Sequence, residues 1–440
     1  MKGFNVTIVG GGSTWTPGLL QSLCKMKDRF PLKKLVLFDI DEKRQEVIGE
    51  FAKILFEENY PGLEFYYTTK VEEAYIDVDF VFIQIRTGGL KMREKDEKIP
   101  LNLGVIGQET CGPGGFAYGL RSIRDMIKTI EDIRRYSKDA WILNYTNPAA
   151  IVAEATNRVF PEDNRLLNIC DQPVNLIRSY AKILGVKSEE LEPVYFGLNH
   201  FGWFTHLYDK NGQDLLPKLR EIILKDGFKP VDAEQRDQSW LDTYGMVKDM
   251  VMDFPDYLPN TYLQYYYYPD YKLSHLDPNY TRANEVIDGR EKRIFDECRR
   301  VAEAGTSKGS VLVHNDAHSE FIIELAESIA YNKQRIYIVI VENNGIISNI
   351  QDDAMVEVAA VMTANGPRPL SVGKIGTFYK GLMESQLAYE KLAVDAYFEG
   401  SYEKALQALT LNRTVVSAKK AREVLDALIE ANKDYWPELR

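Results

Sequence analysis

The sequence predicts an α/β protein in which a doubly wound parallel sheet packs on a second, α+β part. Three observations support this prediction. Short apolar strands alternate with helical patterns through residues 1–170, as in parallel sheets that are covered on both faces. A glycine turn separates the first strand from the first helix, and the alternation becomes less regular after residue 170.

The first unit is a β-branched strand at residues 6–9, followed by Gly10-Gly11-Gly12-Ser13-Thr14 and a helix that begins near Pro17. In this geometry backbone N–H groups and a helix N-terminus hold a pyrophosphate. The next strand ends in Asp39, whose carboxylate can accept hydrogen bonds from a ribose and repels a 2′-phosphate. Trp15 stands where a third glycine would usually fall, but the context favours a Rossmann-like fold, as in lactate and malate dehydrogenases, that binds NAD.

The alternation continues along the first part of the chain. Further strands are expected at residues 64–68, 79–85, 141–144 and 165–167, and helices at 44–58, 123–136 and 174–184. Loops that follow such strands meet at one edge of the sheet, where open α/β sheets bind ligands. Arg86 follows one of these strands, and we expect it to contact the cofactor. A long glycine-rich loop is expected from there to Gly115, and loops of this length are usually functional.

The second part is less regular. A strand is expected at residues 192–198, helices at 216–225, 240–252, 281–304 and near 421–428, and a further strand at 335–341. We expect an NAD-binding domain over residues 1–170 and a domain for substrate, metal and oligomerisation over residues 171–440. No linker is evident between them, so the two are expected to pack as one body.

Composition excludes some classes of function. The 440 residues include 54 Lys and Arg and 65 Asp and Glu, which gives a net charge of −11. We therefore expect neither a nucleic-acid nor a membrane partner, because no basic field would drive such binding. Cys24, Cys111, Cys170 and Cys298 form no CxxC pair, which is typical of reduced cysteines. With no signal-peptide pattern and no apolar run of about 18 residues, we expect a cytoplasmic protein.

A thiol and a carboxylate, Cys170 and Asp171, adjoin at a predicted strand end, before the helix that Pro173 opens. Alone, this pattern is more typical of a buried cysteine and an N-capping aspartate. His200 follows the next strand end, so Cys170 and His200 together could hold a metal ion. His314 and His318 have a commoner metal-binding spacing but lack the glutamate of an HExxH motif, and we expect capping or surface roles for them.

Long stretches of the chain resemble the NAD- and Mn²⁺-dependent glycosidases of glycoside hydrolase family 4, in particular its 6-phospho-α-glucosidases (maltose-6′-phosphate glucosidases). The stretches that carry the resemblance are residues 10–14, 107–115, 143–156, 197–203, 259–266, 281–286 and 431–439. Because they span nearly the whole chain, the resemblance is not a chance match. This family departs from the two-carboxylate scheme of most glycosidases.

The resemblance implies catalytic and metal-binding roles. Cys170 and His200 match Mn²⁺ ligands, Asp171 the general acid, Tyr262 the base, and Glu109 a residue that makes the tyrosine more basic. The implied chemistry oxidises C3 of the sugar with NAD⁺, which together with the metal ion acidifies the C2 proton that the tyrosine removes. Elimination of the aglycone, addition of water and return of the hydride complete a net hydrolysis.

The resemblance also implies the substrate and its contacts. Asn147 matches a contact to a sugar hydroxyl, although a simple helix cap is an equally good interpretation from the sequence alone. Arg93 and Arg282 match substrate ligands near the 6-phosphate. The implied partner is a small phosphorylated disaccharide, bound by a homodimer or homotetramer.

Several alternatives stay open. The 6-phospho-β-glucosidases of the family usually carry asparagine where this chain has Asp171, so aspartate favours an α-linked substrate. The α-specific members usually carry methionine in place of Gln172, which leaves the aglycone preference open between maltose, trehalose and sucrose-isomer phosphates. A β-linked or unphosphorylated substrate, an NAD-dependent 2-hydroxy-acid dehydrogenase and a non-catalytic NAD-binding sensor are the remaining alternatives.

Overall fold

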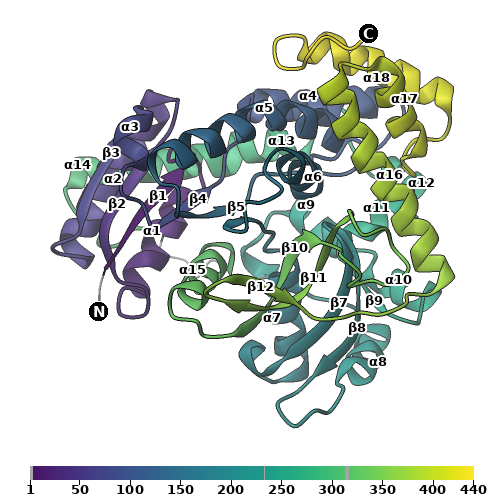
Figure 1. Cartoon of the computed structure of the whole chain (residues 1–440), viewed down its shortest axis with the longest axis horizontal. Helices are drawn as coiled ribbons and strands as arrows, with labels where there is room; N and C mark the ends of the chain where they lie inside the picture. The colour runs from purple at the N-terminus through teal and green to yellow at the C-terminus, as the bar shows by residue number, and fades with distance from the viewer. Residues whose placement is uncertain (1–2, 232, 313–316) are drawn as a thin grey trace.

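A computed structural model describes residues 3–231, 233–312 and 317–440. Its N-terminal part is a parallel sheet with the strand order β3-β2-β1-β4-β5-β6 (Figure 1). The strands are β1 (Phe4–Val9), β2 (Leu32–Phe38), β3 (Glu64–Thr68), β4 (Phe80–Ile83), β5 (Trp141–Asn144) and β6 (Leu166–Asn168). This order is that of a dinucleotide-binding fold, so the predicted doubly wound sheet is confirmed.

Helices cover both faces of this sheet because successive strand residues point to opposite sides. Leu35 and Leu37 of β2 face one apolar core, which α1 and α2 share with α14 and α15. Val36 and Phe38 face the other core, built with α3, α5 and α6. The helices are α1 (Thr16–Lys25), α2 (Glu42–Asn59), α3 (Val71–Tyr75), α4 (Gly89–Asn102), α5 (Gly112–Tyr136), α6 (Ala149–Val159), α7 (Gln172–Leu184), α14 (Lys292–Ala304) and α15 (Ala317–Ala330).

The prediction of one long glycine-rich loop up to Gly115 is wrong. Helix α4 occupies much of that segment, and α5 begins at Gly112. The glycines allow close packing at the start of α5: a Cβ on Gly114 would lie 2.2 Å from the Gln108 carbonyl oxygen, and one on Gly115 would lie 2.4 Å from that of Thr110. These glycines therefore allow two backbone segments to pack closely and do not form a flexible loop.

Antiparallel strands extend the sheet beyond β6. They are β7 (Glu192–Leu198), β8 (Phe201–Tyr208), β9 (Leu258–Pro259), β10 (Arg335–Glu342), β11 (Met355–Thr363) and β12 (Gly366–Pro369). Strand β10 pairs with β6, so in the described residues one twelve-stranded sheet runs through both parts of the molecule. The sheet crosses residue 170, and the division into domains 1–170 and 171–440 stays a prediction.

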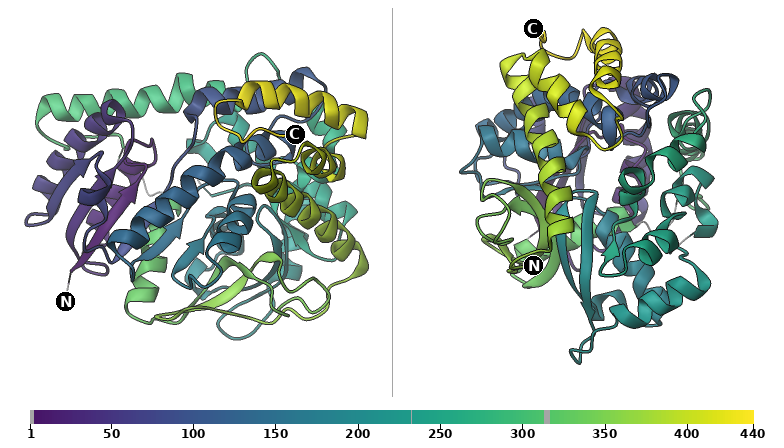
Figure 2. Two further views of the ribbon diagram at one scale, coloured as in Figure 1. Left: turned by 45° about the horizontal axis from the view of Figure 1, so that its top comes forward. Right: turned by 90° about the vertical axis from the view of Figure 1, so that its right-hand side faces the viewer.

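C-terminal helices return to the N-terminal part of the chain. Helices α16 (Thr377–Glu399), α17 (Tyr402–Leu411) and α18 (Ala418–Asn432) pack against α5 and α6 around a third apolar core (Figure 1 and Figure 2). The predicted stripe of Ala421, Leu425 and Leu428 on the last helix is buried in this core. The last helix therefore packs the C-terminal end of the chain against the helices that cover the N-terminal parallel sheet.

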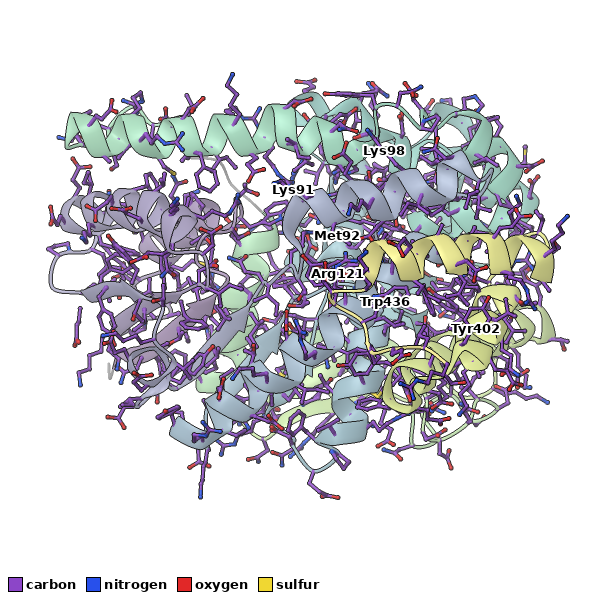
Figure 3. All side chains as sticks on the ribbon, turned by 90° about the horizontal axis from the view of Figure 1, so that it is seen from above. Lys91, Met92, Lys98, Arg121, Tyr402 and Trp436 are labelled. Carbon is purple, nitrogen blue, oxygen red and sulfur yellow. The ribbon has the colours of Figure 1, made fainter. Side chains whose placement is uncertain are left out.

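The remaining helices lie in the second part. They are η1 (Ser188–Glu190), α8 (Leu216–Asp226), η2 (Ala233–Gln235), α9 (Gln238–Leu241), η3 (Asp242–Tyr244), α10 (Val247–Asp253), η4 (Thr261–Leu263), α11 (Gln264–Tyr267), α12 (Pro269–Ser274), α13 (Arg282–Glu285) and η5 (Val286–Glu291). The helix predicted at 240–252 is broken, because Gly245 ends a 3₁₀ turn before α10. Helices α13, η5 and α14 form one rod from α4 to α2 (Figure 3). No helix within the described residues is long and apolar enough to span a membrane.

Candidate active site

The glycine turn after β1 lies tightly against the ends of two neighbouring strands. The backbone N–H groups of Gly10 and Gly11 both donate to the Phe38 carbonyl at 2.9 Å, and that of Gly12 donates to Asp39 Oδ2 at 2.8 Å. A Cβ on Gly10, whose φ is 86°, would lie 2.7 Å from the Gln84 carbonyl oxygen. The turn is therefore a cradle without room for side chains, and the residues present fit a dinucleotide.

Cys170 and His200 come together at the edge where the parallel and antiparallel strands meet. Cys170 follows β6, and His200 lies in the two-residue turn between β7 and β8 with a φ of 61°, which is uncommon for a non-glycine residue. The Cys170 Sγ and His200 Nε2 atoms are 3.3 Å apart, and both residues are buried. The opposite ring nitrogen of His200 lies 3.1 Å from Thr110 Oγ1, which orients the imidazole.

This pair fits a metal ion that also contacts a substrate. Burial lowers the pKa of His200 to about 4, so the imidazole is neutral and offers a lone pair at neutral pH. Burial and the nearby Asp171 carboxylate raise the pKa of the Cys170 thiol well above its usual value, so a thiolate there needs a cation beside it. In the described parts of the chain no cluster of three or more His, Cys, Asp or Glu side chains that could hold a metal ion occurs.

Asp171 occupies the N-cap position of α7, but within the described chain its side chain makes no capping hydrogen bond. Its Oδ2 instead accepts from the Asn175 side-chain amide at 2.8 Å. The interpretation as a helix cap is therefore wrong for the side chain, whereas the expectation of a buried cysteine before it holds. Pro173 lies in the first turn of α7, as predicted.

Tyr262 lies on the 3₁₀ turn η4, and its ring stacks on His200 with centroids 4.2 Å apart and an interplanar angle of 6°. Burial raises the pKa of Tyr262 well above its usual value, and the Glu109 carboxylate raises it further. A tyrosinate there would be a strong base that forms rarely, so proton transfer to it requires an acidified substrate. Gln172 connects this turn to the cysteine segment through two hydrogen bonds. Its Oε1 accepts from Asn260 Nδ2 at 2.6 Å, and its Nε2 donates to Thr261 Oγ1 at 2.8 Å.

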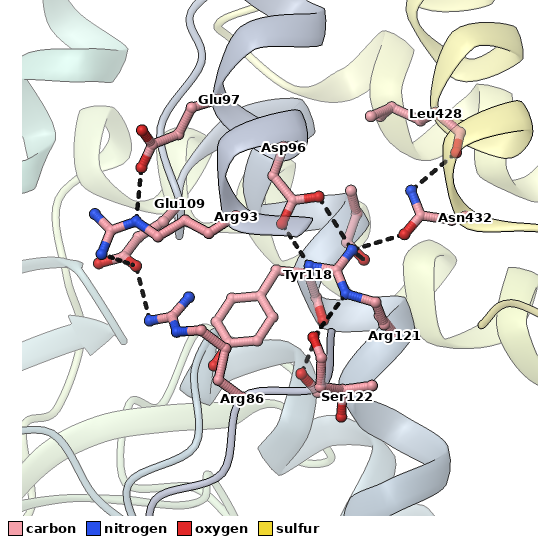
Figure 4. Close-up of polar contacts among 12 residues, drawn as sticks. Arg86, Arg93, Asp96, Glu97, Glu109, Tyr118, Arg121, Ser122, Leu428 and Asn432 are labelled. Carbon is pink, nitrogen blue, oxygen red and sulfur yellow. Dashed lines mark hydrogen bonds and ion pairs between the residues drawn. The ribbon is translucent and has the colours of Figure 1, made fainter. Parts of the chain in front are cut away.

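Glu109 lies among arginine side chains (Figure 4). It accepts from Arg86 at 2.9 Å and from Arg93 at 3.0 Å, and Arg93 also donates to Glu97 at 2.8 Å. Burial alone would raise the pKa of Glu109, but Arg93, Arg86 and further guanidinium groups lower it to about 2. Glu109 therefore stays a carboxylate. The guanidinium of Arg86 also stacks on Tyr118 at 4.6 Å, and its expected contact with the cofactor stays a prediction.

The expected substrate residues have polar atoms available for a ligand. Arg282 opens α13, and its Nη1 donates to Ser239 Oγ at 2.7 Å. Asn147 precedes Pro148, the N-cap of α6, so the interpretation as a helix cap is wrong. The buried atoms Asn147 Oδ1 and Arg93 Nη2 have no hydrogen-bond partner among the described residues. Buried polar atoms are rarely left unpaired, which indicates a ligand site.

Some residues of this site were not predicted from the sequence. Thr110, which contacts His200, lies within a stretch that carried the resemblance, but nothing in the sequence pointed to that contact. Glu357 accepts from Asn199, the neighbour of His200, at 2.9 Å, and burial raises its pKa to about 7. A single glutamate inside a strand gives no sequence signal. The alternative pair with His314 lies partly outside the described residues.

The fold and the site define a class of protein: an α/β enzyme with a glycine turn that fits a dinucleotide, a buried Cys170–His200 pair that fits a metal ion, and a group of arginine side chains around Glu109. The chain belongs to glycosyl hydrolase family 4. The family 4 glycosyl hydrolase model matches residues 5–186, and the model of its C-terminal domain matches residues 195–415.

Individual relatives are similar along their whole length. The phospho-α-glucosidase PagL of Clostridium acetobutylicum is 54% identical, with 100% of both chains covered. The crystal structure of a 6-phospho-α-glucosidase from gut microorganisms in complex with NAD and Mn²⁺ is 62% identical, covers 100% of both chains and has a TM-score of 0.98. Another from the same source, in complex with NAD and glucose-6-phosphate, is 44% identical over 100% of both chains, with a TM-score of 0.95.

Proposed function

We propose that the protein hydrolyses α-linked 6-phosphoglucosides of the maltose 6′-phosphate type to glucose 6-phosphate and an aglycone, with NAD and Mn²⁺ as cofactors. The observation that carries the proposal is the Cys170–His200 pair, with Asp171 adjoining it in sequence and Tyr262 stacked on the imidazole. The relatives named as phospho-α-glucosidases support the substrate class, and the complexes with NAD, Mn²⁺ and glucose-6-phosphate support the cofactors.

When bound, NAD⁺ supplies reversible oxidation of a sugar carbon and Mn²⁺ supplies a Lewis acid. Cys170 and His200 would hold the metal ion next to the sugar. Tyr262 takes the proton from C2 of the sugar, and the Glu109 carboxylate makes its oxygen more basic. Asp171 donates its proton to the leaving oxygen of the aglycone, which an asparagine could not do.

The remaining side chains orient the substrate. Arg93 and Arg282 bind the 6-phosphate through charge-assisted hydrogen bonds. The Oδ1 atom of Asn147 accepts from a sugar hydroxyl, which would satisfy its buried lone pairs. Gln172 acts on the position of Tyr262 through Asn260 and Thr261 rather than on the choice of aglycone, because both ends of its amide are engaged.

A panel of 4-nitrophenyl α- and β-glucosides, each with and without a 6-phosphate, tests the proposal. With NAD⁺ and Mn²⁺ present, we expect release of nitrophenol only from the 6-phospho-α-glucoside, with no accumulation of NADH as followed by its fluorescence. A steady rise in NADH fluorescence would indicate a dehydrogenase. Preferred cleavage of a β-linked or unphosphorylated glucoside would contradict the substrate class, and wild-type behaviour of Asp171→Ala and Tyr262→Phe would indicate a sensor.

We further infer that the protein works in the cytoplasm as a homodimer or homotetramer. All four cysteines are free, as expected in a reducing compartment. Light scattering coupled to size-exclusion chromatography measures the assembly, and a monomer at micromolar concentration would contradict it.

A further inference from the structure

Arg290 lies on the π-helical segment η5, between Arg282 at the start of α13 and helix α14. In an unbroken α-helix, residues eight positions apart would lie about 80° apart around the axis. A π-helical turn contains more residues, so the segment brings Arg290 closer to the side of Arg282. Short π segments inside α-helices are frequent at functional sites.

Arg290 belongs to the group of charges around Glu109. Among the described residues, the guanidinium groups that lower the pKa of this carboxylate are those of Arg93, Arg86, Arg282 and Arg290. In the described part of the chain, Glu109 and Glu97 are the carboxylates that accept from Arg93 or Arg86. Several arginine side chains therefore share the same few carboxylates.

The group has buried donors without an acceptor. Among the described residues, no hydrogen-bond partner exists for Arg290 Nε, Arg93 Nη2 or Arg86 Nη1, all of which are buried. Arg93 as a whole is only 3% exposed. Burial, followed by the neighbouring Arg93 and Arg282 guanidinium groups, lowers the pKa of Arg290 to about 9, although the Glu109 carboxylate opposes the shift. These donors indicate an anionic ligand.

Trp15 fixes the direction of Arg290. The guanidinium carbon lies 4.6 Å from the centroid of the indole ring, within the range of a cation–π contact. Trp15 follows directly on the glycine turn, at the position where a third glycine would usually fall. A flat aromatic face there holds a planar guanidinium in a way that glycine could not.

We propose that Arg290, held against Trp15, is a further ligand of the phosphoryl group of the substrate, beside Arg93 and Arg282. This inference rests on the proposed function, because it assumes a 6-phosphorylated sugar. A phosphate monoester carries nearly two negative charges at pH 7, which suits a group of guanidinium side chains with unpaired donors. The pyrophosphate of the cofactor shares this chemistry, and Trp15 lies beside the glycine turn. The two cations that act most strongly on Arg290 are Arg93 and Arg282, which are the expected 6-phosphate ligands.

The test uses the full-length protein loaded with NAD⁺ and Mn²⁺. Titration calorimetry with glucose 6-phosphate should show an affinity roughly 10- to 100-fold weaker for Arg290→Met than for wild type. The affinity for NAD⁺, measured on the cofactor-free protein, should change less than about threefold. Arg290→Lys keeps the positive charge but not the planar guanidinium donors. Its affinity for glucose 6-phosphate should therefore lie between those of wild type and Arg290→Met. Arg293→Met removes an exposed cation of the same rod and should match wild type.

Glucose 6-phosphate affinity within about twofold of wild type in Arg290→Met would overturn the inference. So would an equal loss of NAD⁺ affinity, which would assign Arg290 to the cofactor pyrophosphate. Failure of the proposed function is recognised separately, because wild-type protein would then neither bind glucose 6-phosphate nor cleave a 6-phosphoglucoside. Circular dichroism of each variant checks the fold, and Arg290→Lys carries the test if Arg290→Met does not fold.

Discussion

Replacement of Arg121 by methionine is expected to destabilise the whole protein and not only one helix. Arg121 is fully buried between α4, α5 and α18 (Figure 3, Figure 4). Its Nη1 donates to Asp96 at 3.0 Å and to Asn432 at 2.6 Å, and its Nε donates to the Thr87 carbonyl at 2.9 Å. One guanidinium therefore joins the last helix of the chain to the helix that carries Arg93.

The size of the stability loss depends on Asp96, whose buried carboxyl loses its partner in Arg121→Met. Breaking a buried ion pair by removing one partner typically costs about 3–5 kcal/mol. Burial raises the pKa of Asp96 to about 6 even though Arg121 opposes the shift, so without Arg121 the carboxyl becomes protonated at pH 7. A protonated Asp96 carries no charge, which limits the free-energy cost of leaving it buried without Arg121. We therefore expect the free energy of unfolding to fall by about 3 kcal/mol, the lower end of that range.

Urea unfolding at pH 7 followed by circular dichroism measures this loss. Arg124→Met, on the exposed face of the same helix, is the matched control and should change stability by less than about 0.5 kcal/mol. The double variant Asp96→Leu/Arg121→Met should be more stable than Arg121→Met alone, because it leaves no buried carboxyl. A loss below about 1 kcal/mol for Arg121→Met, or a double variant less stable than the single one, would show that the buried Arg121–Asp96 pair does not stabilise the fold.

Three further predictions concern pH, metal and substrate. Glu390 is buried with a pKa raised to about 8, so between pH 4.5 and 8 the folded protein holds a proton that the unfolded chain has lost. This group should lower the free energy of unfolding by up to about 1.4 kcal/mol for each unit of rise in pH within that window. Urea unfolding of Glu390→Gln should show a slope that is smaller by that contribution. An identical slope in the variant would contradict this. Exhaustive chelation should abolish glucosidase activity and added Mn²⁺ should restore it; unchanged turnover would exclude the Cys170–His200 metal site. Arg93→Ala should raise KM for phosphorylated substrates roughly 10- to 100-fold, and a loss of kcat at unchanged KM would count against a phosphate contact.

The parallel half of the fold was predictable because its physical signals are local. The predicted strands at 64–68 and 141–144 have the bounds found in the structure, and that at 192–198 does too. Helix α4 was missed for a physical reason. Its inward face carries Arg93, Asp96 and Glu97, so its charges are buried and the helical apolar stripe is absent. A helix that places charged side chains in a buried site lacks the apolar periodicity by which helices are predicted.

The site was predictable only in part. The adjacency of Cys170 and Asp171 was visible in the chain, but their closeness to His200 depends on pairing between β6, β10, β11 and β7. The stacking of Tyr262 on His200 and the position of Arg290 depend on non-local packing and on a π-helical segment. No pattern within a short window of sequence specifies such contacts.

The fate of the proton at C2 of the sugar tests the proposed mechanism most directly. Cleavage of a 6-phospho-α-glucoside in D₂O with NAD⁺ and Mn²⁺ should give glucose 6-phosphate that carries deuterium at C2, as seen by NMR. This label is expected because Tyr262 removes that proton in each turnover, and Tyr262→Phe should lose both the label and the cleavage. Product released at the full rate without deuterium at C2 would contradict proton abstraction by Tyr262.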